Sequence, residues 1–228
     1  SRPYAFTARP WELRKTETID VMDALGSNIR VDMRGREAMR IMPRNHDDVN
    51  EEWLSDKSRF VWDGLNMQRL DRPFIRRDGK LAAASWDEAF DLIESKLKGK
   101  GDKTAAIAGD LVCAEGQFAL KGVMNALQSP HLDCRQDGAK ISGPRGNYLF
   151  NARIAGIEEA DALLLIGSNP RLEAPVLNAR IRKRYLAGNF PIAAIGEATD
   201  LTYQTEFIGA GAGTLADLLV GRQSFAET

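Results

Sequence analysis

The sequence predicts an α/β protein, with a small N-terminal antiparallel β unit followed by a doubly wound, mainly parallel α/β domain. Between Lys15 and Met42, short stretches that alternate polar and apolar residues are separated by Gly and Asn, which is typical of antiparallel strands. After residue 85, short apolar runs alternate with helical stretches, which indicates right-handed βαβ crossovers. We therefore expect two domains, at residues 1–70 and 71–228.

The expected N-terminal unit is short and rich in turns. Arg34-Gly35 is the predicted hairpin turn, because Gly tolerates the backbone angles that tight turns require. A polar loop then leads into a short helix over residues 51–62. The stretch 65–83, with Arg72-Pro73 and Asp78-Gly79, is predicted to be a linker that contains a second hairpin. The strands expected in the first unit lie at residues 18–21, 29–33 and 38–42.

The clearest predicted helix follows Ser85, because Ser85-Trp-Asp-Glu88 is a capping box. Its apolar residues share one helical face: Trp86, Ala89, Phe90, Ile93 and Leu97. After it we expect strands at 104–108, 131–134, 162–166 and 191–195, and helices at 115–127, near Asn147 and at 174–186. The glycine-rich stretch 209–213 is predicted to be a flexible loop before a last helix.

Composition restricts the class of protein. With 43% hydrophobic residues, 28% charged residues and a net charge of −1, the chain of 228 residues is typical of a globular protein and offers no argument for nucleic-acid binding. Its apolar runs are far shorter than the ~20 residues that span a bilayer. The two cysteines, Cys113 and Cys134, suit a reducing compartment, although one disulfide stays open. Because the first residue is Ser1, we expect a processed chain or, preferably, one excised from a longer protein.

One candidate ligand site is the turn Gly167-Ser168-Asn169-Pro170, which follows an apolar run and precedes a helix. Such a turn at the carboxyl end of a strand suits a phosphate group. Five basic residues follow the turn: Arg171, Arg180, Arg182, Lys183 and Arg184. The last four lie in the C-terminal half of the helix, where cations stabilise the helix dipole without any ligand, and we prefer this explanation. The glycines at 209, 211 and 213 do not have the spacing of a dinucleotide fingerprint.

The remaining candidates favour structural explanations. His46, beside two aspartates, is expected in a solvated loop rather than at a metal, and Glu158 and Glu159 at a solvated helix end. His131 is expected at a surface or edge. Cys113 at a strand-to-helix turn resembles a nucleophile, although a lone cysteine is more often a small buried residue. With no triad, zinc or P-loop motif, we predict no catalytic residue and no metal ligand.

The spacing of Asp20, Asp23 and Ser27 is that of a C-x-x-C-x-x-x-C motif, and Ser55 stands where a fourth cysteine would follow. A [4Fe-4S] cluster requires four soft thiolate ligands, which carboxylate and hydroxyl oxygens do not replace. We therefore interpret these four residues as degenerate cluster positions.

Four blocks of sequence, at residues 7–28, 50–60, 154–161 and 167–183, closely resemble the large iron-sulfur subunit of respiratory complex I. They resemble the molybdopterin oxidoreductases, including formate dehydrogenases, more distantly. The resemblance implies that residues 1–70 are a degenerate [4Fe-4S] domain of the type found before a bis-molybdopterin cofactor. It also implies that Ser58 replaces a glycine of the family's Cys-x-Lys-Gly-Arg-Phe motif.

The function implied by this resemblance belongs to a complex that transfers electrons from NADH through FMN and iron-sulfur clusters to quinone, coupled to proton pumping. We expect a structural fragment of that enzyme, inactive alone, with no cofactor of its own and a vestigial phosphate turn at Gly167, Ser168 and Asn169. The clusters are expected in a ferredoxin-like region before Ser1. The expected partners are other peripheral-arm subunits, with neither nucleic acid nor direct membrane insertion.

The resemblance also implies a location on the cytoplasmic side of a bacterial inner membrane or on the mitochondrial matrix side. Two alternatives stay open. One is a molybdopterin-type or nucleotide-binding oxidoreductase domain, with Cys113 or Ser168 near the chemistry. The other is a plain binding module for a partner protein.

Overall fold

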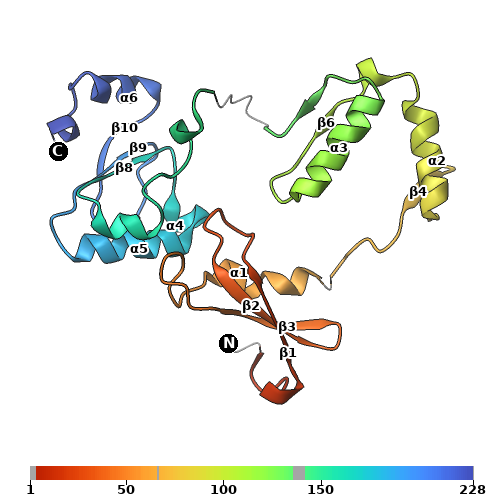
Figure 1. Cartoon of the computed structure of the whole chain (residues 1–228), viewed down its shortest axis with the longest axis horizontal. Helices are drawn as coiled ribbons and strands as arrows, with labels where there is room; N and C mark the ends of the chain where they lie inside the picture. Colours follow the sequence, from red (N-terminus) through yellow and green to blue (C-terminus); the bar gives the residue numbers. More distant parts are fainter. Residues whose placement is uncertain (1–3, 66, 136–141, 228) are drawn as a thin grey trace. The chain divides into compact units, whose positions relative to one another are not determined.

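The computed structural model describes residues 4–65, 67–135 and 142–227. The chain forms two compact units, which are described separately. The first combines residues 1–67 with 149–228, and the second comprises residues 68–148. Figure 1 shows both units coloured along the sequence.

The first unit begins with an antiparallel sheet of three strands in the order β1-β2-β3. The strands are β1 (Arg14–Ile19), β2 (Asn28–Arg34) and β3 (Glu37–Pro43). The predicted hairpin is confirmed, with Gly35 at a φ of +60° in the turn. One face of the sheet packs Ile29 and Ile41 against Leu54, because alternate residues of a strand point to the same side.

The loop after β3 is held by the amide of Asn50, which is fully buried. Its Oδ1 accepts a hydrogen bond from the Asn28 backbone N–H at 2.9 Å. Its Nδ2 lies 3.0–3.1 Å from the carbonyl oxygens of Arg44, Glu51 and Trp53. This side chain therefore ties β2 to the loop, and it satisfies backbone groups that would otherwise be buried without partners.

The helix that follows is α1 (Asp56–Phe60), continued by a 3₁₀ turn, Val61–Leu65. The predicted range of 51–62 was too long at its N-terminus. The helix begins at Ser55, because its hydroxyl accepts a hydrogen bond from the Ser58 N–H at 3.2 Å and so caps the first turn.

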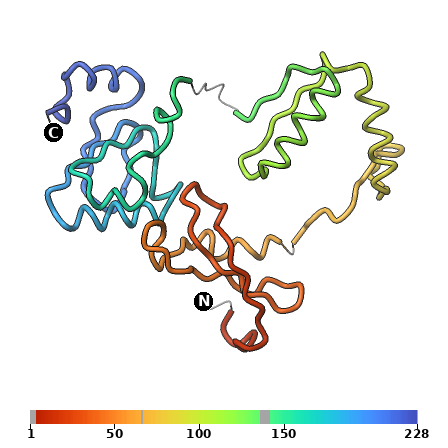
Figure 2. The backbone as a smooth tube through the Cα atoms, in the orientation of Figure 1, coloured from red at the N-terminus to blue at the C-terminus, as the bar shows by residue number. Residues whose placement is uncertain are grey.

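The second sheet of this unit is parallel, in the order β10-β9-β8. Its elements are β8 (Leu163–Ile166), α4 (Pro170–Glu173), α5 (Pro175–Leu186), β9 (Ile192–Ile195), β10 (Glu206–Gly209) and α6 (Ala212–Leu219). Ile181 of α5, with an exposed fraction of 1%, packs against Leu165 and Ile192 of the sheet. Figure 2 follows this strand–helix–strand path as a tube. The predicted alternation of strands and helices is confirmed.

Strand β10 was not predicted. With only Phe207 and Ile208 as apolar residues, it carries a weak local signal. It forms by pairing in parallel with β9, a contact that sequence periodicity does not reveal. Gly209 ends it at a φ of +140°, where a Cβ atom would lie 2.5 Å from Thr214 Oγ1. A larger residue would therefore not fit at this position.

Arg180 of α5 joins this helix to the loop after β3, and its exposed fraction is 3%. One Nη atom lies 2.6 Å from the Asp47 carbonyl oxygen and 3.1 Å from that of Val49. The other Nη lies 2.7 Å from Glu158 Oε1. Lys183 pairs with the same glutamate and with Glu51, at 3.3 and 2.5 Å. The prediction that Glu158 is merely solvated was therefore wrong.

The second unit contains an antiparallel hairpin, a parallel pair of short strands and two helices. Its elements are β4 (Phe74–Arg77), β5 (Lys80–Ala83), α2 (Trp86–Leu97), β6 (Ala106–Ile107), α3 (Ala114–Ala126) and β7 (Leu132–Asp133). The predicted capping box of α2 is confirmed, with reciprocal hydrogen bonds between Ser85 and Glu88. Among the described residues of both units, no helix has the length and apolar content needed to cross a membrane.

Candidate functional site

The four residues predicted at cluster positions come together in the first unit. We call Asp20, Asp23, Ser27, Ser55 and Ser58 the oxygen cluster. The loop between β1 and β2 positions the first three, and the Asp20 N–H donates to the Ser27 carbonyl oxygen at 2.8 Å to close it. The start of α1 provides the two remaining serines. Only Asp23 is partly exposed.

Two aspartates shape the loop through their own backbone. Asp20 Oδ1 accepts from the Met22 N–H, and Asp23 Oδ1 accepts from the Leu25 N–H, both at 3.0 Å. These are Asx turns, in which a side-chain oxygen replaces a backbone acceptor. Each aspartate therefore has one oxygen committed to the loop and the other available to the cluster.

Ser58 is the residue that links the two halves of the cluster. Its hydroxyl donates to Asp20 Oδ2, and the Ser55 hydroxyl donates to Ser58 Oγ at 3.0 Å. The sequence indicated Ser58 only as a replacement for glycine and assigned it no role. The replacement of glycine by serine was the signal that could have indicated this role, because a serine hydroxyl can bridge a carboxylate and a second hydroxyl and a glycine cannot.

Two oxygens of the cluster are buried without a hydrogen-bond partner among the described residues: Ser27 Oγ and Asp23 Oδ2. Burial, and next to it the neighbouring charge of Asp20, raise the pKa of Asp23, against the opposing effects of backbone hydrogen bonds and Lys57. The site is therefore polar, crowded with acceptor oxygens and unfavourable for further negative charge.

Replacing Ser58 with alanine is expected to destabilise the first unit by about 1–3 kcal/mol, because Asp20 Oδ2 and Ser55 Oγ then lose a buried partner. Urea unfolding measures the effect. Ser168→Ala, at an exposed serine, is the matched control and is expected to change stability by less than about 0.5 kcal/mol. Equal unfolding midpoints for the two variants would show that the serine bridge contributes nothing.

The second candidate, the turn Gly167-Ser168-Asn169, lies where predicted, at the carboxyl end of β8. With Gly196 and Glu197 after β9 it lines a cavity of about 290 Å³. The Asn169 N–H already donates to Glu173 Oε1 at 2.9 Å, and Asn169 Oδ1 accepts from the Leu172 N–H at 3.3 Å. The Glu173 carboxylate thus occupies the Asn169 backbone N–H that a bound phosphate would need. Phosphate binding at this turn stays a prediction.

The structure does not bring the other candidates into a common site. His46 and His131 are exposed, and His46 contacts Glu51 through its backbone. Cys113 stands at the N-cap position of α3 without a side-chain capping hydrogen bond, and both it and Cys134 are exposed, so the expectation of a buried cysteine was wrong. Within the described ranges, no group of three or more His, Cys, Asp or Glu side chains is arranged to hold a metal ion.

Two protein families match this chain, each over a different range of residues. Residues 69–228 match the molybdopterin oxidoreductase family, and residues 13–63 match the NADH-ubiquinone oxidoreductase NDSU1/NuoG-like 4Fe-4S domain. The G subunit of the NADH-quinone oxidoreductase of Rickettsia bellii is 50% identical over 229 residues, and that of Rickettsia felis is 51% identical. The mitochondrial 78 kDa subunit of the NADH-ubiquinone oxidoreductase of Candida albicans is 51% identical over 227 residues.

These matches cover 97–100% of this chain but only 32–34% of each relative. The chain therefore spans about a third of the length of these proteins. The identity to them concerns that third alone.

The match at residues 13–63 corrects one prediction. We had expected no cofactor in this chain and had placed the iron-sulfur clusters before Ser1. The iron-sulfur domain family instead lies within the chain itself. The resemblance had placed a [4Fe-4S] type of domain at residues 1–70, but the expectation of no cofactor rested on the oxygen side chains at the four ligand positions.

The residues of the oxygen cluster can be tested against the group that this domain family implies. The range 13–63 contains no cysteine, and the cluster positions hold carboxylate and hydroxyl oxygens. Ser27 Oγ and Asp23 Oδ2 are hard donors without a hydrogen-bond partner among the described residues, whereas cluster iron takes soft thiolates. This donor set does not fit a [4Fe-4S] cluster. The family match over residues 69–228 and the identity along the whole chain decide which family this is. The chain belongs to the molybdopterin oxidoreductase family, and over its whole length it corresponds to a region of the G subunits of NADH-quinone oxidoreductases.

Proposed function

We propose that this chain is part of the large subunit of a proton-pumping NADH:quinone oxidoreductase, whose complex passes electrons from NADH through FMN and iron-sulfur clusters to quinone. The supporting observation is identity of about 50% along the whole chain to the G subunits of bacterial enzymes and to a mitochondrial protein. The complex's other peripheral-arm subunits are its partners in this proposal. Its place is the cytoplasmic face of a bacterial membrane or the matrix face in mitochondria.

Within that complex, the role proposed for the first unit is to hold its two sheets in a fixed arrangement. Arg180 supports this role because its two Nη atoms bind two backbone carbonyl oxygens and Glu158, although its Nε is buried without a hydrogen-bond partner among the described residues. Asn50 continues the restraint into β2. A rigid connection of this kind suits a protein on which neighbouring subunits assemble.

A segment exchange tests the proposal. In the Candida albicans 78 kDa protein, the 227-residue region that matches this chain is replaced by the present sequence. We expect the chimera to join the complex and to support NADH-driven quinone reduction, whereas a protein without that region does not. A chimera that accumulates at wild-type level but does not enter the complex contradicts the proposal.

The second candidate function is a nucleotide- or molybdopterin-binding oxidoreductase domain. It is favoured by the family match at residues 69–228 and by the cavity at the ends of β8 and β9. The carboxylate of Glu173 at the turn and the acidic Glu197 weigh against a phosphate there. Stoichiometric molybdenum and phosphorus in the purified full-length protein would favour this candidate over the first.

A further inference from the structure

The oxygen cluster holds two carboxylates that no basic side chain balances at close range. Asp20 is buried, with an exposed fraction of 4%, and Asp23 is only partly exposed. Neither aspartate forms a salt bridge in the part of the chain that the structure describes. The charge of Lys57 acts on Asp23, but the Lys57 side chain is exposed. Because a buried carboxylate is costly without a counter-charge, this cluster favours a cation.

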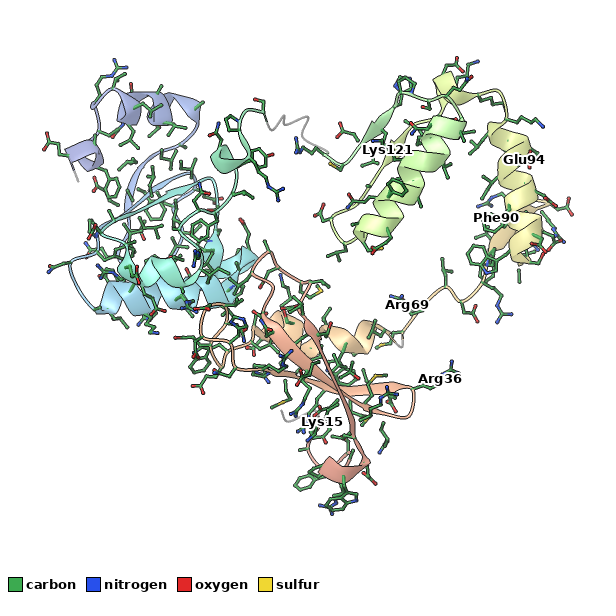
Figure 3. The ribbon with its side chains drawn as sticks, viewed as in Figure 1. Lys15, Arg36, Arg69, Phe90, Glu94 and Lys121 are labelled. Carbon is green, nitrogen blue, oxygen red and sulfur yellow. The ribbon has the colours of Figure 1, made fainter. Side chains whose placement is uncertain are left out.

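The Ser27 hydroxyl lies on the same side of the sheet as the Asp20 carboxylate. The register of β1 and β2 pairs Ile19 with Asn28, so that Asp20 and Ser27 are opposed at the next position. The Asp20 N–H donates to the Ser27 carbonyl oxygen at 2.8 Å. Opposed residues of an antiparallel pair direct their side chains to one face, with Cβ atoms about 5 Å apart. Figure 3 shows the side chains of this sheet as sticks, with Lys15 labelled on β1.

That face of the sheet leads to the start of α1. Ile29, two residues after Ser27 on β2, packs against Leu54, which lies just before α1. Alternate residues of a strand point to the same side, so Ser27 points toward α1 as Ile29 does. The Asp20 carboxylate has the same direction, because its Oδ2 accepts a hydrogen bond from the Ser58 hydroxyl of α1. The Ser27 hydroxyl is therefore aimed into the oxygen cluster.

Three oxygen atoms of this arrangement have lone pairs free to bind a metal ion. Ser27 is fully buried, and neither its Oγ nor Asp23 Oδ2 has a hydrogen-bond partner among the described residues. Asp20 Oδ2 accepts from Ser58, and an ionised carboxylate oxygen has a second lone pair. Carboxylates and hydroxyls are hard donors, which bind hard cations better than the iron of a sulfide cluster.

We propose that the oxygen cluster is a binding site for a hard divalent cation of the Ca²⁺ type, held by Asp20, Asp23 and Ser27. Two carboxylates match the charge of such an ion. Ca²⁺ accepts irregular sets of oxygen ligands, whereas Mg²⁺ requires a nearly octahedral set and keeps several water molecules, which a buried loop disfavours. The bound ion connects the loop between β1 and β2 to the start of α1, so the stability of the first unit depends on it.

Titration of the 228-residue chain with Ca²⁺, after treatment with EDTA, tests the proposal. Isothermal titration calorimetry is expected to show a single Ca²⁺ bound per chain. Saturation with Ca²⁺ is expected to raise the melting temperature of the first unit by about 3–8 °C, because the ion binds the folded state. Mg²⁺ and K⁺ at the same concentration are expected to raise it less.

Two variants remove proposed ligands and keep the contacts of the fold. Asp23→Asn retains the Oδ1 atom that accepts from the Leu25 N–H, and Ser27→Ala removes a hydroxyl without a hydrogen-bond partner among the described residues. In EDTA both variants are expected to melt no lower than wild type, because each removes an unsatisfied buried oxygen or a repelling charge. In Ca²⁺ both are expected to lose most of the rise in melting temperature.

Asp48→Asn and Ser168→Ala are the matched controls, because both residues are exposed, and they are expected to retain the full effect of Ca²⁺. A wild-type chain that binds no Ca²⁺, or an equal rise in all four variants, would overturn the proposal. So would a rise of the same size with K⁺, which would show that the site does not select a divalent ion. Formation of a stoichiometric [4Fe-4S] cluster on anaerobic reconstitution with iron and sulfide would also overturn it.

Discussion

Replacing Arg180 with alanine is expected to lower the free energy of unfolding of the first unit by about 3–5 kcal/mol. The variant removes a buried guanidinium that serves the carbonyl oxygens of Asp47 and Val49 and the carboxylate of Glu158. The two carbonyl oxygens lose a charged donor, whereas Glu158 keeps its ion pair with Lys183. Because the guanidinium links α5, which packs on the parallel sheet, to the loop after β3, the loss is expected to spread to both parts of the unit.

Urea unfolding followed by circular dichroism measures this effect. Arg222→Ala is the control, because the Arg222 side chain is exposed and pairs with Asp217 at the surface. Such pairs contribute about 0–1 kcal/mol. Arg180→Lys is expected to fall between wild type and alanine, since an ammonium keeps the charge but not the planar fork. If Arg180→Ala unfolds at the same urea concentration as Arg222→Ala, the bridge is dispensable.

Replacing Asp32 with alanine is expected to lower the free energy of unfolding by about 3 kcal/mol. Its side chain is fully buried in the three-stranded sheet, where Arg30 and Arg40 each donate to it at 2.7 Å. Arg40 also lies over the Tyr4 ring, 4.4 Å from its centroid. The variant leaves two partly buried cations adjacent on one sheet face without their shared anion, so repulsion adds to the lost hydrogen bonds.

The same carboxylate gives the first unit a defined pH dependence. Burial by itself raises the pKa of Asp32, but the hydrogen bonds and charges of Arg30 and Arg40 together bring that pKa below its ordinary value of 3.8. Its stabilising contribution is therefore complete above about pH 4 and is lost as the pH falls through the lowered pKa.

Urea unfolding at pH 7 and at pH 2–3 tests both statements about Asp32. The difference between wild type and Asp32→Ala is expected to be large at pH 7 and to shrink on acidification. Asp48→Ala, at an exposed aspartate, serves as the control and is expected to show a small difference at both values. A difference for Asp32→Ala that does not depend on pH would contradict the assignment of a lowered pKa.

Features that depend on neighbours in the chain were readable from the sequence. The capping box of Ser85 and Glu88, the Asp78-Gly79 hairpin and the helix at 175–186 all follow from local backbone chemistry. The convergence of Asp20, Ser27 and Ser55 was also anticipated, because their spacing matches a known ligand pattern.

Features that depend on distant partners were decided only by the folded chain. Strand β10 exists because β9 offers a free edge, and Ser58 gains its role because Asp20 lies beside it, 38 positions earlier in the sequence. Arg180 was expected to stabilise a helix end, yet two of its three partners lie more than 130 residues away in the sequence. A pattern of residue types reports local geometry, whereas such contacts arise from burial and pairing in three dimensions.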